Sequence, residues 1–225
     1  MPRPTFRFAP SPNGELHLGH AYSALFTAQA ARETEGRFLL RLEDIDVLRC
    51  TDALVRECLF DLGWLGLAWE EPVRRQSAHM ADYRASLRRL EDMGLLYPCT
   101  CSRQDIARAT GPDDPLDPDG TPLYPGTCRA RGLGDRQGLK AGGQPHALRL
   151  DTGKALALPP EDLSFEEEGI GPAGETGRIP ATPGRWGDVV LARKDIGTSY
   201  HIAVVTDDAL QGVTHVTRGQ DLFHA

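Results

Sequence analysis

The stretch RFAPSPNGELHLGH, residues 7–20, decides the fold of this chain. It predicts a short strand over Thr5–Phe8, followed by a turn that the prolines and Gly14 impose. A helix then begins near His17 and runs to about Glu35. A strand, a tight turn and a helix N-terminus together favour anion binding, because the free backbone N–H groups of the first helical turn point toward the ligand. The stretch therefore predicts an anion-binding site near the start of the chain.

The expected helix carries two histidines in its first turn. Residues 21–31 are rich in Ala and include one Leu and one Gln, all of which favour helix, and Gly36 suits the C-terminal cap. His17 and His20 straddle Gly19, so two imidazoles can donate to phosphate oxygens while the glycine lets a nucleotide approach the backbone. Two histidines in one turn also occur in ordinary core helices. The combination with the preceding proline turn is the more specific signal.

The combination resembles the first nucleotide-binding motif of the class I aminoacyl-tRNA synthetases, in the form found in the glutamyl branch. The resemblance extends from Arg7 to Asp221. It implies an α/β fold, a Rossmann-like catalytic domain with a parallel sheet and an inserted zinc-containing α+β subdomain. The implied segments are the first half of the catalytic domain at 1–98, the inserted zinc-binding subdomain at 99–188, and the second half at 189–225. The family continues beyond that point with a lysine-rich second motif that stabilises the triphosphate, so the second half is expected to be incomplete.

Composition limits the classes of protein that fit. The 225 residues carry 25 basic and 32 acidic side chains, a net charge of −7, which is not typical of a nucleic-acid-binding protein. Local arginine clusters could still bind RNA, although each is equally well explained as a solvated helix face. The N-terminus lacks the apolar run of a signal peptide, and five cysteines, an odd number, argue against a disulfide framework. We expect a cytoplasmic monomer with no membrane partner.

An acidic residue follows the second expected strand. The apolar run Phe38–Leu42 predicts a buried parallel strand, and Glu43 stands directly at its carboxyl end. Ligands of open α/β sheets bind at that edge, so the carboxylate of Glu43 can hold the ammonium group of an amino acid. The alternative is an acidic turn that starts the next helix, expected over 53–62.

The remaining elements are expected in chain order. A long amphipathic helix is predicted over Met80–Met93. The regions 146–150, 163–165 and 188–193 are predicted as strands, and the Gly- and Pro-rich region 169–187 as a surface loop. Near the end, Tyr200–Asp208 and Val213–Asp221 are predicted as two buried parallel strands.

The resemblance also assigns roles to individual residues. It implies that His17, Gly19 and His20 form the catalytic, nucleotide-binding group, with ATP as co-substrate and Mg²⁺ to neutralise its phosphates. An arginine suits the γ-carboxylate of glutamate, because its planar fork binds a carboxylate through two hydrogen bonds. The implied L-glutamate contacts are Arg7, Phe8, Ala9, Pro10, Ser11, Glu43, Tyr200 and Arg218.

Three cysteines border a loop-rich segment. Cys99, Cys101 and Cys128 could hold this segment by binding one zinc ion, or they could be reduced and unligated. The spacing resembles the C-x-C…Y-x-x-x-C set of the glutamyl-Q tRNA(Asp) synthetases, in which a tyrosine oxygen completes a structural zinc site. The resemblance therefore implies Tyr124 as the fourth ligand.

The chemistry that the resemblance implies is ATP-dependent activation of L-glutamate to glutamyl-adenylate. In the glutamyl-Q family, glutamate then passes to the queuosine base in the anticodon of tRNA(Asp). One alternative is a fragment of an ordinary glutamyl-tRNA synthetase, which charges the 3′ end of tRNA(Glu). Another is a catalytically inactive, zinc-bearing RNA-binding remnant.

Overall fold

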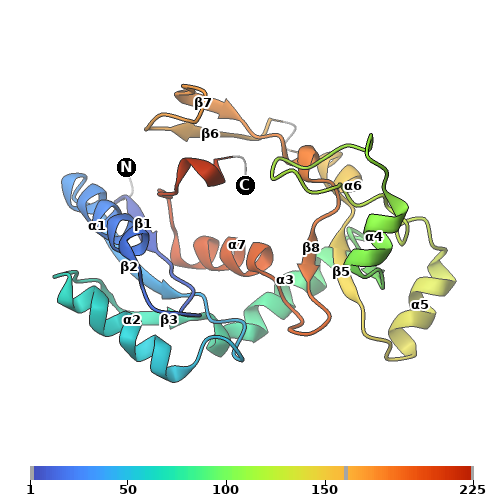
Figure 1. Ribbon diagram of the computed structural model, residues 1–225, viewed down its shortest axis with the longest axis horizontal. Coiled ribbons are helices and arrows are strands. Elements are labelled where there is room, and N and C mark those ends of the chain that lie inside the picture. Colours follow the sequence, from blue (N-terminus) through green and yellow to red (C-terminus); the bar gives the residue numbers. More distant parts are fainter. Residues whose placement is uncertain (1–2, 160–161, 224–225) are drawn as a thin grey trace. The chain divides into compact units, whose positions relative to one another are not determined.

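The computed structural model describes residues 3–159 and 162–223, which form two compact units. The first unit contains the chain up to Ser86 together with Tyr200–Arg218, and the second contains Leu87–Ser199 and the residues after Arg218 (Figure 1). The units divide near residues 86 and 200, whereas the predicted domains divide at 98 and 188. The outer ends of the predicted ranges, residues 1–2 and 224–225, lie outside the described residues. Among the helices of the described ranges, none has the length and apolar character needed to span a membrane.

The first unit is built on a parallel sheet of three strands. β1 (Thr5–Phe8), β2 (Arg37–Leu42) and β3 (Glu70–Arg75) lie in the order β1-β2-β3. β1 and β2 confirm the two strands predicted from the sequence. β3 was not predicted, because its sequence EEPVRR lacks the apolar residues that usually mark a parallel strand.

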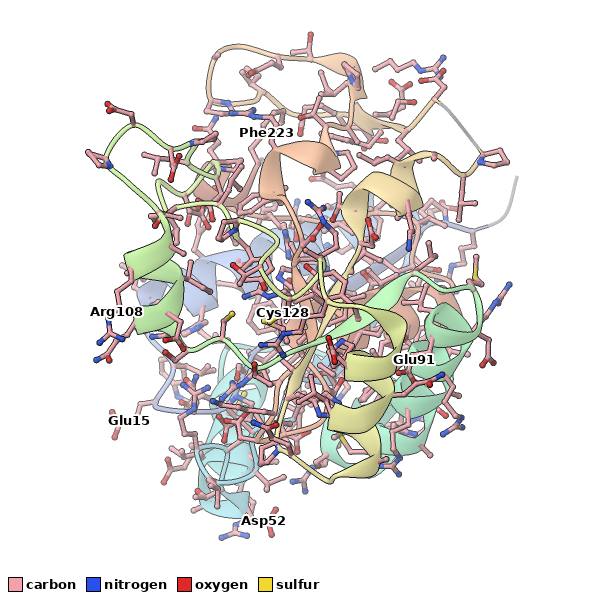
Figure 2. The ribbon with its side chains drawn as sticks, turned by 90° about the vertical axis from the view of Figure 1, so that its right-hand side faces the viewer. Glu15, Asp52, Glu91, Arg108, Cys128 and Phe223 are labelled. Carbon is pink, nitrogen blue, oxygen red and sulfur yellow. The ribbon has the colours of Figure 1, made fainter. Side chains whose placement is uncertain are left out.

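Helices α1 (Leu18–Glu33) and α2 (Asp52–Trp64) follow β1 and β2. Thr51 caps α2 by accepting the backbone N–H of Leu54, and Asp52 projects into solvent in the first turn (Figure 2). Other helical segments are α3 (Met80–Asp92), α7 (Tyr200–Gln211) and the short 3₁₀ turn Gln76–His79.

The C-terminal end of α1 differs from the prediction that Gly36 is its cap. Glu35 takes the left-handed conformation with φ of 51°, in place of the glycine. Gly36 is needed for another reason, since a Cβ there would lie 2.9 Å from the carbonyl oxygen of Pro4. The glycine lets the chain turn closely under β1 before it enters β2.

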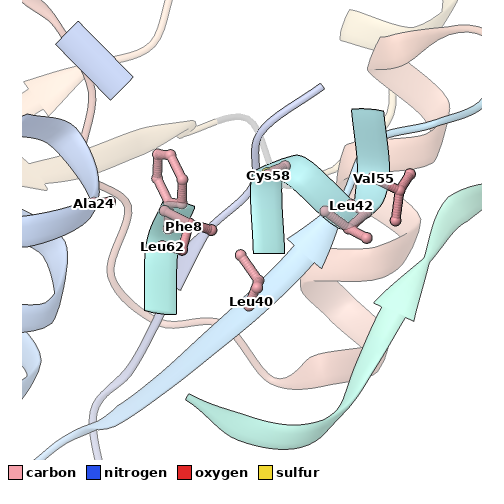
Figure 3. Packing of buried hydrophobic residues seen from close by; sticks show 7 residues of the cluster. All are labelled: Phe8, Ala24, Leu40, Leu42, Val55, Cys58 and Leu62. Carbon is pink, nitrogen blue, oxygen red and sulfur yellow. The ribbon is translucent and has the colours of Figure 1, made fainter. Parts of the chain in front are cut away.

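One face of the sheet carries the hydrophobic core of this unit. Strand alternation directs Phe8, Leu40 and Leu42 to the same face, where they pack against the two helices (Figure 3). Ala24 of α1 and a stripe of α2 complete the cluster, the α2 residues being Val55, Cys58 and Leu62. Cys58 is therefore a core residue.

The opposite face of the sheet is charged and contacts α7. The prediction of a strand over Tyr200–Asp208 is wrong, because these residues begin α7. The β-branched pair Val204–Val205 favours a strand, but helical spacing is what places Asp207 and Asp208 against the arginines of β1, β2 and β3. Tertiary ion pairing has overridden local propensity.

The predicted strand over Val213–Asp221 is formed only in part. His215 makes an isolated parallel bridge with Phe6, and the backbone N–H groups of Thr214 and His215 donate to the carbonyl oxygen of Thr5. The segment thus lies beside β1 without a continuous ladder. Gln220–Leu222, which overlaps the end of the predicted strand, is a 3₁₀ turn of the second unit.

The second unit is α+β in character. Its larger sheet is antiparallel, in the order β4 (Leu96–Cys99), β5 (Ala147–Leu150) and β8 (Val190–Ala192). The strands β6 (Ser164–Glu167) and β7 (Gly177–Pro180) form a hairpin, so the predicted loop 169–187 is partly strand. Short helices complete the unit, namely α4 (Arg103–Ala109), α5 (Leu133–Ala141), α6 (Thr152–Leu156) and the 3₁₀ turn Pro183–Trp186.

Candidate functional site

The N-terminus of α1 brings together the histidines that the sequence singled out. Nδ1 of His17 accepts the backbone N–H of Gly19 at 3.1 Å, and Nδ1 of His20 accepts the backbone N–H of His17 at 3.3 Å. This reciprocal arrangement is a capping box in which histidines take the usual places of Ser and Glu. The two rings lie 3.9 Å apart between centroids.

The capping box fixes which ring nitrogen is free to donate. Because both Nδ1 atoms accept a hydrogen bond, the proton of each neutral imidazole must sit on Nε2. Burial, followed by the proximity of His17, lowers the pKa of His20 below its ordinary value, so His20 is neutral at neutral pH. The helix terminus thus offers imidazole Nε2–H donors in addition to its backbone.

The charged face of the sheet forms a second part of the site. Arg41 is fully buried and donates to Asp208 at 2.6 Å, to Gln211 at 3.1 Å and to Glu43 at 3.1 Å. Arg7, which is 7% exposed, donates to the same Asp208 at 3.3 Å. Arg41 and Asp208 therefore connect two predicted glutamate contacts, Arg7 and Glu43.

Glu43 is held at both its backbone and its side chain. Its N–H donates to the carbonyl oxygen of Pro10 at 2.9 Å, which ties the end of β2 to the turn after β1. Burial raises the pKa of Glu43, and the Arg41 guanidinium opposes that rise. The carboxylate is thus fixed at the carboxyl edge of the sheet.

A neighbouring network holds α7 in place. Asp207 is fully buried and accepts hydrogen bonds from Arg74 at 2.6 Å and from Gln76 and Tyr83 at 2.9 Å each. Burial, then the hydrogen bond to Asp207, raises the pKa of Tyr83, so this phenol stays protonated and donates. Arg74 thus pairs with both Asp207 and Asp82 within this network.

The sequence analysis missed Arg41, Asp207 and Asp208. One signal was available for Arg41, since an arginine inside the apolar run Phe38–Leu42 needs a buried counter-charge. The two aspartates were noted only as the acidic end of an expected strand. Nothing in their local sequence indicates that they face β1 and β2.

The other predicted glutamate contacts lie in two places. The side chain of Phe8 belongs to the hydrophobic core, so only its backbone faces the turn. Ala9 and Pro10 form that turn, and the exposed Ser11 has its hydroxyl 3.8 Å from the sulfur of the buried Cys50. Tyr200 and Arg218 contact each other through the phenol oxygen and the guanidinium.

The second unit brings the predicted metal ligands together. The sulfurs of Cys99, Cys101 and Cys128 all lie within 4.8 Å of one another. The phenol oxygen of Tyr124 lies 3.4 Å from the sulfur of Cys99 and 3.7 Å from that of Cys101. Cys128 is fully buried, whereas Arg108 in the same unit projects outward (Figure 2).

The chemistry of this donor set fits zinc. Tetrahedral coordination with Zn–S bonds of about 2.3 Å places ligand sulfurs about 3.8 Å apart, and those of Cys101 and Cys128 are 3.5 Å apart. Burial alone would raise the pKa of Cys128, but hydrogen bonds, first among them that with Tyr124, lower it to about 6. Each of the five cysteines, all within the described ranges, is a free thiol.

Comparisons with known proteins agree on one family. The family model described as tRNA synthetases class I (E and Q), catalytic domain, matches residues 5–225. The chain is 50% identical to a glutamyl-Q tRNA(Asp) synthetase from Rhodobacter capsulatus, over 97% of the chain and 77% of the relative. It is 43% identical to one from Symbiobacterium thermophilum, over 96% of the chain and 66% of the relative.

A solved structure shares the fold. The crystal structure of a glutamate tRNA ligase from Elizabethkingia meningosepticum in complex with its amino acid matches with a TM-score of 0.73 at 24% identity. The match covers 98% of this chain and 44% of that structure. The chain therefore spans less than half of that ligase, about three quarters of the Rhodobacter relative and just under two thirds of the Symbiobacterium relative.

Proposed function

Because this chain belongs to the catalytic-domain family of class I tRNA synthetases (E and Q), we propose that it activates L-glutamate with ATP. We propose further that the glutamyl group then passes from the adenylate to the queuosine base in the anticodon of tRNA(Asp), and that AMP leaves. The observation that carries the first step is the charged face of the first unit. There, buried Arg41 and Asp208 hold the predicted amine-binding Glu43 and the predicted carboxylate-binding Arg7 in one network.

The proposed reaction is a displacement at phosphorus. The α-carboxylate of glutamate attacks the α-phosphorus of ATP, a new P–O bond forms, and pyrophosphate leaves. The protein contributes positioning and charge stabilisation and needs no nucleophile of its own. The Nε2–H groups of His17 and His20 donate to the phosphates, and Gly19 makes room for the nucleotide. Mg²⁺, when bound with ATP, neutralises phosphate charge.

The substrate contacts divide by charge. Glu43 binds the ammonium group of L-glutamate, while Arg7 and Arg218 offer guanidinium groups to its carboxylates. Tyr200, already in contact with Arg218, orients that arginine. Phe8, Ala9, Pro10 and Ser11 contribute mainly through the backbone of the turn.

Substitutions of His17 separate its two roles. His17→Asn keeps a good helix cap but removes the imidazole donor, whereas His17→Ala removes both. We expect His17→Ala to lose about 1 kcal/mol of unfolding free energy, and His17→Asn to stay near wild type. Both variants should slow pyrophosphate exchange by about 10²–10³-fold. Urea unfolding and exchange rates measure the two effects, and a fully active His17→Asn variant would remove the catalytic role.

Substitution of Glu43 tests the amine contact. Glu43→Gln keeps the shape of the side chain but removes the charge that pairs with the substrate ammonium. Loss of such a buried pair costs about 2 kcal/mol or more, so the KM for glutamate should rise roughly 30-fold or more while the KM for ATP changes little. Glu70→Gln is the control, because Glu70 pairs with Arg37 at a partly exposed position of the same sheet. Equal KM values for the two variants would exclude the contact.

The acceptor is proposed from the zinc-ligand pattern and from the names of the relatives. Cys99, Cys101, Tyr124 and Cys128 form the C-x-C…Y-x-x-x-C set that the sequence analysis associated with the glutamyl-Q family. We propose that these four residues hold one structural Zn²⁺.

Acceptor choice tests this proposal. The chain receives labelled glutamate and ATP with either queuosine-containing tRNA(Asp) or tRNA(Glu), and tRNA(Asp) lacking queuosine is the matched control. Label on queuosine-containing tRNA(Asp) alone is the expected result. Label on tRNA(Glu) would make the chain part of an ordinary synthetase, and label on neither, with no pyrophosphate exchange, would favour the inactive RNA-binding remnant.

A further inference from the structure

Arg149 of β5 lies against one of the predicted metal ligands although it offers no ligand atom itself. Its guanidinium carbon is 3.9 Å from the centroid of the Tyr124 ring, which is contact distance for a stacked cation–π pair. One hydrogen bond orients the guanidinium, from Nη1 to the carbonyl oxygen of Asp188 at 2.6 Å. Among the described residues, its buried Nε has no hydrogen-bond partner.

The Tyr124 ring is held on two sides. Its oxygen accepts the backbone N–H of Cys128 at 2.7 Å, and Arg149 covers a ring face. Together these contacts direct the oxygen toward the sulfurs of Cys99 and Cys101. A tyrosine is a longer and freer ligand than a cysteine, so its position depends more on such neighbours.

Charge favours the same arrangement. Three cysteine thiolates and a tyrosine oxygen around a divalent ion would leave a net negative charge in a partly buried site. Arg149 supplies a positive charge against the ring of Tyr124, whereas the charge of Arg129 is paired with buried Asp188 at 3.2 Å. Groups that orient metal ligands in this way commonly change metal affinity by about 10- to 100-fold.

We propose that Arg149 is the positioning residue that makes Tyr124 an effective fourth metal ligand, through its flat guanidinium stacked on the ring. The inference rests on the proposed zinc site and extends it to a residue that binds no metal. Lysine cannot replace the arginine in this role, because an ammonium group has no plane to stack.

The test measures Zn²⁺ affinity by competition with a chromophoric chelator in wild type, Arg149→Met and Arg149→Lys. Both variants should bind zinc about 10- to 100-fold more weakly. Arg178→Met is the matched control, because Arg178 lies in the same unit and pairs with Asp162 at an exposed position. Its affinity should equal that of wild type.

A second set of variants, made in the Tyr124→Cys protein, distinguishes a loss of ligand positioning from general damage to the fold. In Tyr124→Cys the fourth ligand is a thiolate with no ring, so adding Arg149→Lys, which keeps the positive charge, should cost no further affinity. The Co²⁺ absorption spectrum gives an independent readout, which should change with Arg149→Lys only when Tyr124 is present. Unchanged affinity in Arg149→Lys, or an equal loss in the Tyr124→Cys background, would overturn the inference. A wild-type chain that binds neither metal would instead refute the zinc site itself.

Discussion

Replacing Arg41 with methionine is expected to lower the free energy of unfolding by about 3–5 kcal/mol. Arg41 is fully buried and is the shared partner of Glu43, Asp207 and Asp208. Methionine fills a similar volume but leaves buried carboxylates without their counter-charge. Removing one partner of a buried ion pair costs more stability than replacing both partners with apolar residues. Urea unfolding at neutral pH measures the loss.

The pH dependence and a control make this prediction specific. Burial raises the pKa of Glu43, so its carboxylate takes up a proton at higher pH than an exposed glutamate does. A protonated Glu43 needs no guanidinium, so the destabilisation should be largest at neutral pH and shrink as the pH falls. Arg49→Met, which removes a surface pair with Asp46, should cost less than about 1 kcal/mol. A loss of less than about 1 kcal/mol of unfolding free energy in Arg41→Met would contradict the structural role given to Arg41 on the charged face.

Loss of the metal ligands is expected to have the second large effect. Structural zinc contributes about 10–16 kcal/mol of apparent binding free energy in small zinc domains, so a chelator or Cys128→Ser should unfold the segment between β4 and α5. Hydrogen exchange should report this as lost protection in residues 96–131, and elemental analysis should fall from about one zinc per chain to none.

Two other cysteines provide the control for that effect. Cys50 and Cys58 are buried in the first unit, outside the cluster of three sulfurs. Cys50→Ala and Cys58→Ala should therefore keep the full zinc content, even if they lower the free energy of unfolding. Zinc that survives Cys128→Ser, or a chain purified without chelator that never contains zinc, would count against the site.

Local signals made the first strand, turn and helix predictable. The prolines, Gly14 and the histidines of the α1 terminus lie within a few residues of one another. The three-residue spacing of His17 and His20 is also the spacing that a capping box requires. The cluster of Cys99, Cys101 and Cys128 with Tyr124 was predictable for a different reason. The three cysteines stood out from the sequence itself, only Tyr124 was added from the family pattern, and the structure brings the four residues together.

The charged face could not be predicted in the same way. α7 was predicted as a strand because its valines favour that state, and β3 was missed because its residues are mostly charged. Both segments are specified by partners far away in the sequence. Arg74 reaches Asp207 across 133 residues and Arg41 reaches Asp208 across 167. The helix and strand propensities of a segment do not reflect such distant ion pairs, so the sequence of the segment alone could not predict its structure.

The most direct measurement is glutamate-dependent exchange of labelled pyrophosphate into ATP by the zinc-loaded chain. The account predicts exchange with L-glutamate, little or none with L-glutamine or D-glutamate, and a sharply raised glutamate requirement in Glu43→Gln. A folded, zinc-loaded chain that shows no glutamate-dependent exchange at any substrate concentration would contradict it.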